Sequence, residues 1–236
     1  MRMNPLLVAL DVDTAADAFA LADTLRGVVG GFKIGSRLFT AEGPTVVSRL
    51  VDRGDRVFLD LKFHDIPSTV AGAVEAATRL GVWMLNVHAS GGLDMMRAAR
   101  TAACEESART AAPAPLVIAV TVLTSLERQS LARLGIADDV EQHVDRLARL
   151  TSEAGLDGVV ASPQEAARIR RWADSRFLIV TPGIRTGGRA DDQARTSGAA
   201  DALHAGASYL VVGRPIIKAA DPVEAAGKML EEMGRK

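Results

Sequence analysis

Two aspartates and two lysines in short apolar segments of the amino-terminal half of the chain are the first candidates for chemistry. They are Asp11, Lys33, Asp60 and Lys62, in the segments 5–12, 30–35 and 56–63. One such charge alone is consistent with a solvated residue at the mouth of a loop. Charges in three successive apolar segments are costly unless the carboxylates and ammonium groups compensate one another. Grouped in one site, they would stabilise a charge that develops on a substrate and transfer a proton.

The segment 56–63 carries two of these charges, two residues apart. Because side chains alternate between the two faces of a strand, we expect Asp60 and Lys62 to project to the same face. Leu59, Leu61 and Phe63 then take the other face. The segment is therefore predicted to present a carboxylate and an ammonium group side by side.

Asp65 follows the same segment, two residues before Pro67, where a turn into a helix is expected. Capping of this helix is one role for Asp65 and participation in the charged site is another, and the residues alone leave both open. His64 and His88 also lie near the ends of apolar segments. We expect both to be structural histidines, since they belong to no metal-ligand cluster in the sequence.

The carboxyl-terminal half carries a different signal. TPGIR at 181–185 and VVGRP at 211–215 close two apolar segments, and barrels commonly bind phosphate at such positions through backbone N–H groups. Arg185 and Arg214 would grip the phosphate oxygens. The polar, glycine-containing stretch 186–198 is interpreted as a lid over the site, with an ordinary surface loop as the alternative.

These residues need a scaffold that brings distant segments to one place. Eight short segments are apolar and rich in β-branched residues, as expected of parallel strands buried on both faces. They are residues 5–12, 30–35, 56–63, 82–90, 115–123, 157–162, 177–183 and 209–215. The stretches between them have helical periodicity, so the chain is predicted to consist of βαβ units.

Capping signals support this division. Ser162 and Asp221 are each followed by proline and, three residues on, by glutamate, which indicates helix starts. Gly81, Gly155 and Gly206 precede strands and are expected to end helices. Eight evenly spaced units favour a closed (β/α)₈ TIM barrel over a doubly wound open sheet, with residues 1–236 as one α/β domain.

Composition narrows the function further. The chain has 236 residues, 48% of them hydrophobic, and a formal net charge of −1, so it lacks the basic surface that a nucleic-acid partner requires. No apolar stretch approaches the roughly 20 residues of a membrane-spanning helix. A single cysteine, Cys104, excludes an intramolecular disulfide and a multi-cysteine metal site, and with the absence of a signal-peptide pattern it favours a cytoplasmic location.

Seven stretches of the chain occur in the order typical of one enzyme family. They are ALDV, FKIG, FLDLKFHDIPST, NVHASGG, VTVLTS, VTPGIR and VVGRPI. In these motifs the chain resembles the bacterial type of the orotidine 5′-phosphate decarboxylase family, from about residue 6 to residue 222. The DLKFHDIP element is very specific for it.

The resemblance implies an activity. Members of this family convert orotidine 5′-monophosphate to uridine 5′-monophosphate and CO₂, the last step of de novo pyrimidine synthesis, without a metal or an organic cofactor. The resemblance implies a homodimer whose sites are completed across the interface. It assigns proton delivery at C6 to Lys62, flanked by Lys33, Asp60 and Asp65, with Asp65 serving the site of the partner subunit.

The resemblance also implies substrate contacts. Asp11 and Lys33 match the residues that hold the ribose hydroxyls, and Thr69 and Thr124 match contacts to the nucleotide. The phosphate contacts are matched by Arg185, Gln193, Gly213 and Arg214.

Two other functions fit these residues less well. A metal-dependent decarboxylase or aldolase of sugar phosphates shares the Asp-x-Lys-x-x-Asp element on the same barrel, but it needs a glutamate ligand where this chain has Lys33, a cation that would repel Mg²⁺. A non-catalytic pyrimidine-nucleotide-binding protein would not need two lysines and two aspartates around a carboxylate site.

Overall fold

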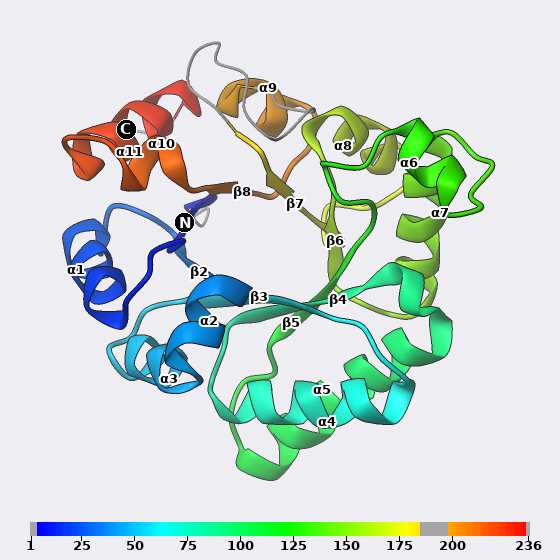
Figure 1. Cartoon of the computed structure of the whole chain (residues 1–236), viewed down its shortest axis with the longest axis horizontal. Helices are drawn as coiled ribbons and strands as arrows, with labels where there is room; N and C mark the ends of the chain where they lie inside the picture. The colour runs from blue at the N-terminus through cyan, green and yellow to red at the C-terminus, as the bar shows by residue number, and fades with distance from the viewer. Residues whose placement is uncertain (1–3, 185–197, 235–236) are drawn as a thin grey trace.

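Eight parallel strands form a closed barrel in the computed structural model, which describes residues 4–184 and 198–234 (Figure 1). Each strand pairs with the next along the chain, and β8 closes the barrel against β1. The strands are β1 (Leu6–Ala9), β2 (Gly31–Gly35), β3 (Val57–Phe63), β4 (Met84–His88), β5 (Leu116–Val120), β6 (Gly158–Val160), β7 (Leu178–Pro182) and β8 (Tyr209–Val212). The predicted TIM barrel is confirmed, and every predicted strand segment contains one of these strands.

Helices surround the strands as an outer ring (Figure 1). They are α1 (Ala15–Leu25), α2 (Ser36–Glu42), α3 (Thr45–Asp52), α4 (Pro67–Arg79), the 3₁₀ turn η1 (Ala89–Gly91), α5 (Leu93–Thr110), α6 (Arg128–Arg133), α7 (Val140–Glu153), α8 (Pro163–Arg170), α9 (Ala199–His204), α10 (Arg214–Ile217) and α11 (Pro222–Glu232). Within the described part of the chain, no helix combines the length and the apolar character needed to cross a membrane.

The strands are buried on both faces, which explains their continuous apolar sequences. One set of side chains packs between the strands and the helices and forms the larger core. The other fills the barrel interior, where Leu7, Phe58, Met84 and Ile118 meet. The barrel interior is therefore filled with side chains and is a packed scaffold.

The predicted caps are present and explain where several helices begin and end. Ser162 begins α8 with a complete capping box, and the side chain of Asp221 accepts hydrogen bonds from two N–H groups of the first turn of α11. Gly81, Gly155 and Gly206 have φ values of 74°, 76° and 102°. A side chain is strained in that conformation, so glycine stands where each helix must turn into the next strand.

β3 is irregular next to the site. Leu59 pairs with Leu85 and Phe63 with Val87, so four steps along β3 match two along β4. Within this bulge Lys62 has φ = 56°, in the left-handed region that residues other than glycine rarely adopt. The expectation of a regular strand is wrong here. Because side chains alternate between the two faces of a strand, an insertion of two residues leaves the faces unchanged. Leu59 and Phe63 therefore still face the helices, as predicted.

Candidate active site

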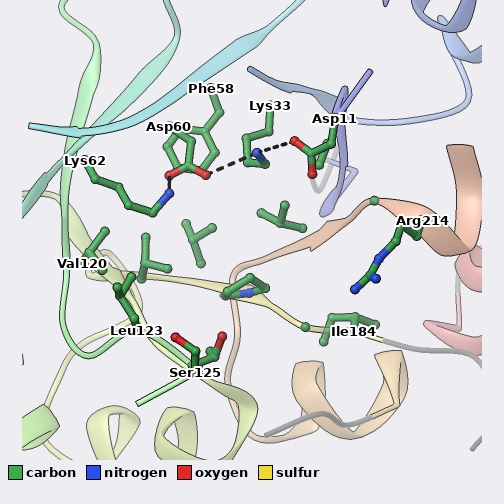
Figure 2. Close-up of a pocket in the computed structure, with 18 of the residues that line it drawn as sticks. Asp11, Lys33, Phe58, Asp60, Lys62, Val120, Leu123, Ser125, Ile184 and Arg214 are labelled. Atoms are coloured by element: carbon green, nitrogen blue, oxygen red, sulfur yellow. Dashed lines mark hydrogen bonds and ion pairs between the residues drawn. The ribbon is translucent and has the colours of Figure 1, made fainter. Parts of the chain in front are cut away.

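A cavity of about 980 Å³ opens at the carboxyl ends of the strands (Figure 2). Barrel enzymes place their catalytic groups at this end. The structure brings seven of the residues predicted from sequence to its wall: Asp11, Lys33, Asp60, Lys62, Thr124, Gly213 and Arg214. They come from the first, middle and last parts of the chain, and closure of the barrel makes them neighbours.

A continuous row of ion pairs crosses one wall of the cavity (Figure 2). Lys33 Nζ lies 3.2 Å from Asp11 Oδ1 and 3.3 Å from Asp60 Oδ2, and Lys62 Nζ lies 2.7 Å from Asp60 Oδ1. The side chains of Lys33 and Asp60 are only 10% and 13% exposed, whereas that of Lys62 is 34% exposed. The row therefore ends in an ammonium group that a ligand in the cavity can reach.

Gly35, at the end of β2, leaves room for this row. A Cβ at this position would lie 2.9 Å from Lys33 Nζ and 3.6 Å from Asp11 Oδ1. A larger residue would push the ammonium group away from its carboxylate partners, so the glycine is part of how the sequence places Lys33.

Asp60 is held in its ionised form. Burial alone would raise the pKa of this carboxyl group, but the charges of Lys33 and Lys62 outweigh burial, and hydrogen bonds from Lys62 and Asn86 add to their effect. The net result is a pKa below the ordinary value. At neutral pH the cavity wall therefore presents a permanent carboxylate between two cations.

His64 and His88 lie outside this wall. Their ring centroids are 5.4 Å apart, and neither lines the cavity. Burial lowers the pKa of His88, and the nearby His64 and Lys62 lower it further. Across the described residues, no group of three or more His, Cys, Asp or Glu side chains is arranged to hold a metal ion.

Asn86 was not predicted as a site residue from the sequence. It lies in β4, is fully buried, accepts a hydrogen bond from the backbone N–H of Lys62 (2.8 Å) and donates one to Asp60 Oδ1 (2.7 Å). A signal was available, because an amide side chain inside an apolar strand requires hydrogen-bond partners, and charged groups of the neighbouring strand were the candidates.

The opposite end of the cavity is formed where β7 and β8 end. Gly183 and Ile184 follow β7, and Gly213 and Arg214 lead from β8 into α10. Figure 2 shows the guanidinium group of Arg214 extending toward Ile184. Arg185 and Gln193 lie outside the described residues, as does the predicted lid at 186–198 except for its last residue.

Asp65 and Thr69 do not line the cavity of their own chain. Both are exposed, in the turn after β3 and the first turn of α4. The N-cap of α4 is Ile66, whose side chain caps nothing, and the carboxylate of Asp65 accepts a hydrogen bond from the N–H of Ile66 (2.6 Å). Helix capping by Asp65, one of the two roles left open by the sequence, is therefore wrong.

The wall facing the charged row is largely apolar. Val120, Leu123 and Ile184 line it, together with the hydroxyl-bearing Ser125 (Figure 2). Val120, Leu123 and Ile184 were not selected from the sequence, since apolar residues at strand ends carry no chemical signature. An ionic wall opposite an apolar one suits a ligand with a planar ring and a charged substituent.

The fold and the cavity define a (β/α)₈-barrel enzyme with an ionic site at the carboxyl ends of its strands. The chain belongs to the orotidine 5′-phosphate decarboxylase / HUMPS family, whose model matches residues 4–229. It is 54% identical to the orotidine 5′-phosphate decarboxylase of Moorella thermoacetica, over 98% of this chain and 92% of that protein. It is 50% identical to the protein of the same name from Pseudomonas putida strain GB-1, over 98% and 97% of the two chains.

Solved structures give the same result. The orotidine 5′-phosphate decarboxylase of Lactobacillus acidophilus superimposes with a TM-score of 0.86 at 33% identity, over 97% of this chain and 98% of the other. An uncharacterized conserved protein from Geobacillus kaustophilus superimposes with a TM-score of 0.84 at 35% identity, over 97% and 99%. The barrel and its closure are thus shared along the whole length of these relatives.

Proposed function

We propose that this chain decarboxylates orotidine 5′-monophosphate to uridine 5′-monophosphate and CO₂, the final step of de novo pyrimidine synthesis, using neither a metal nor an organic cofactor. Membership of the family and the names of relatives at 50–54% identity support the reaction. The observation that carries the proposal is the row of ion pairs that ends in Lys62 at the cavity wall.

The reaction needs a cation in the plane of the pyrimidine ring. Loss of CO₂ leaves an electron pair at C6 that the ring π system does not delocalise. The ammonium group of Lys62 stabilises this charge and then donates a proton to C6. At about 4 Å and an effective dielectric constant of about 20, one such interaction is worth roughly 4 kcal/mol, or about three decades in rate.

Asp60 has a second role in this proposal. Its ionised carboxylate lies beside the position of the substrate carboxylate, and repulsion between the two favours departure of CO₂. Binding energy from the distant phosphate offsets the repulsion when the substrate binds. Lys33 keeps the Asp60 carboxylate in place from the other side, at 3.3 Å.

The remaining predicted residues are proposed as binding groups. Asp11 and Lys33 hold the ribose hydroxyls, and Thr124 contacts the nucleotide. Gly213 and Arg214 bind the phosphate, together with Arg185 and Gln193. The position of the first five on the cavity wall supports these roles.

A homodimer is part of the proposal, with Asp65 and Thr69 completing the site of the partner subunit. Their exposure outside their own cavity supports it, and so does Ile66 between them, an apolar side chain that is 63% exposed. The cytoplasmic location and the assignment of residues 1–236 to one domain stay predictions.

A metal-dependent reaction on a sugar phosphate is not favoured. The ammonium group of Lys33, 3.3 Å from Asp60 Oδ2, already occupies the position beside that carboxylate that a divalent cation would need. Repulsion between the two cations opposes binding of the metal.

The proposal is tested by following the loss of orotidine 5′-monophosphate absorbance with the purified chain in the presence of EDTA. We expect stoichiometric formation of uridine 5′-monophosphate at a rate that EDTA does not change. Loss of activity with EDTA would contradict the cofactor-free reaction, and lack of turnover without EDTA would contradict the function itself.

A further inference from the structure

The amide of Asn86 is fully buried on the inner side of β4, where it makes two hydrogen bonds to the active-site strand β3. The partners fix its orientation. The backbone N–H of Lys62 is a donor and therefore faces the amide oxygen, whereas the carboxylate of Asp60 is an acceptor and faces the amide nitrogen. One side chain thus holds the backbone of the proposed proton donor and the side chain of its carboxylate partner.

The bond to Lys62 joins β3 to β4 where the regular pairing of the two strands is interrupted. The pairing of β3 with β4 shifts between Leu59 and Phe63, and Lys62 lies inside this bulge with φ = 56°. Such a conformation persists only where surrounding contacts determine it. The amide oxygen of Asn86, 2.8 Å from the Lys62 nitrogen, is such a contact.

The bond to Asp60 determines how its two oxygens are shared. Oδ1 accepts from Asn86 Nδ2 and from Lys62 Nζ, both at 2.7 Å, and this leaves Oδ2 to Lys33 at 3.3 Å. A neutral donor in this position holds the carboxylate plane without adding a charge to the row. The ammonium groups of Lys33 and Lys62 are thereby kept on different oxygens.

We propose that Asn86 is a positioning residue for decarboxylation, which sets the Lys62 ammonium group and the Asp60 carboxylate in their reactive arrangement. This inference rests on the proposed function and adds a residue to it. The positioning role requires a side chain of the length of asparagine that carries both a hydrogen-bond donor and an acceptor. Aspartate offers only acceptors when ionised, and alanine offers neither group.

Two variants test the inference. Asn86→Ala removes both hydrogen bonds and is expected to lower kcat about 100-fold, as displacements of a catalytic group do. The dissociation constant of uridine 5′-monophosphate is expected to stay within about twofold, because the groups assigned to ribose and phosphate are untouched. Thr151→Val in α7 is the control, since Thr151 is equally buried and its hydroxyl donates only within its helix and toward Met96.

Asn86→Asp adds a second measurement, the pH dependence of activity, which would not change if Asn86 only supported the fold. When two carboxyl groups face each other, the pKa of the pair is raised and they share one proton. A protonated aspartate at position 86 can therefore donate a hydrogen bond to Asp60, as the amide of Asn86 does. Activity relative to wild type is therefore expected to rise as the pH falls from about 8.5 to 6. The groups around position 86 are Asp60 and Lys62 on β3, His88 on the same strand and the apolar Ile118 on β5. The ratio to wild type removes the effect of groups that titrate alike in the two proteins.

The outcomes separate the two proposals. Lack of turnover by the wild type would overturn the proposed function. A wild-type enzyme that turns over, with kcat unchanged in Asn86→Ala or a pH-independent activity ratio in Asn86→Asp, would overturn the role of Asn86. Loss of uridine 5′-monophosphate binding in both variants would also overturn it, since Asn86 would then support only the fold.

Discussion

Lys62 Nζ lies 2.7 Å from Asp60 Oδ1, and the two residues belong to the same strand, β3. The bulge in β3 and the left-handed backbone at Lys62 accompany this contact, and Lys33 holds the other oxygen of Asp60. The ammonium group is thus oriented by its partner and reachable from the cavity. Such preorganisation stabilises charge in a transition state without the cost of rearranging groups during the reaction.

Sharing of the site between subunits is tested by mixing two inactive variants. Lys62→Ala and Asp65→Ala each damage every site of a homodimer. In a random mixture, half of the dimers combine the two variants, and one of their two sites has both residues intact. We expect recovery of about a quarter of the wild-type activity after the mixed subunits are allowed to exchange. Activity no higher than the sum of the two separate preparations would contradict a site completed by Asp65 of the partner.

Phosphate binding is predicted to contribute to catalysis as well as affinity. Orotidine, which lacks the phosphate, should show a lower kcat and a higher KM, because remote binding energy offsets the repulsion at C6. Arg214→Ala is expected to slow the phosphorylated substrate and to leave the slow reaction of orotidine unchanged. A change in KM alone would show that the phosphate contributes only uniform binding.

The stability of the protein should depend on pH through Asp60. Its folded-state pKa is below the ordinary value of about 3.9, so its ionised form stabilises the fold above that pH, and this contribution disappears as the pH falls through the folded pKa. Asp60→Asn is therefore expected to lower the free energy of unfolding by about 1–3 kcal/mol at pH 7. Urea denaturation at neutral and at acidic pH measures this difference. If the difference in free energy of unfolding between wild type and Asp60→Asn does not become smaller at acidic pH, the lowered pKa of Asp60 is contradicted.

The cap of α11 provides a prediction for stability alone. Asp221→Ala removes a side chain that accepts from the N–H groups of Val223 and Glu224. We expect a loss of about 1 kcal/mol in the free energy of unfolding, with kcat and KM unchanged. A change in kcat or KM that accompanies the loss of stability would contradict this prediction and show that α11 influences the site.

The fold was predictable because a parallel barrel has a strong sequence pattern. Continuous apolar segments marked the strands. The N-cap residues Ser162 and Asp221, each followed by a proline, marked helix starts, and Gly81, Gly155 and Gly206 marked helix ends. The bulge in β3 was not predictable, because Lys62 is not a glycine and its backbone conformation depends on a partner, Asn86, in another strand.

The charged row was also predictable, since Asp11, Lys33, Asp60 and Lys62 needed one another to be tolerated in apolar strands. The positions of Asp65 and Thr69 outside the cavity of their own chain could not be predicted from the sequence. The chain leaves the cavity after Phe63, and alternation along a strand gives no information on side chains beyond its end. The role proposed for them in a partner subunit came from the family resemblance, because no pattern within one chain encodes it.

The most direct test of the account is the single-turnover rate of Lys62→Ala with orotidine 5′-monophosphate, measured beside its affinity for uridine 5′-monophosphate. The alanine variant should bind the product, because the groups assigned to ribose and phosphate remain, yet lose at least the three decades or so in rate that one ammonium group provides. A rate equal to that of the wild type would contradict the claim that the charge at C6 is stabilised and protonated by Lys62.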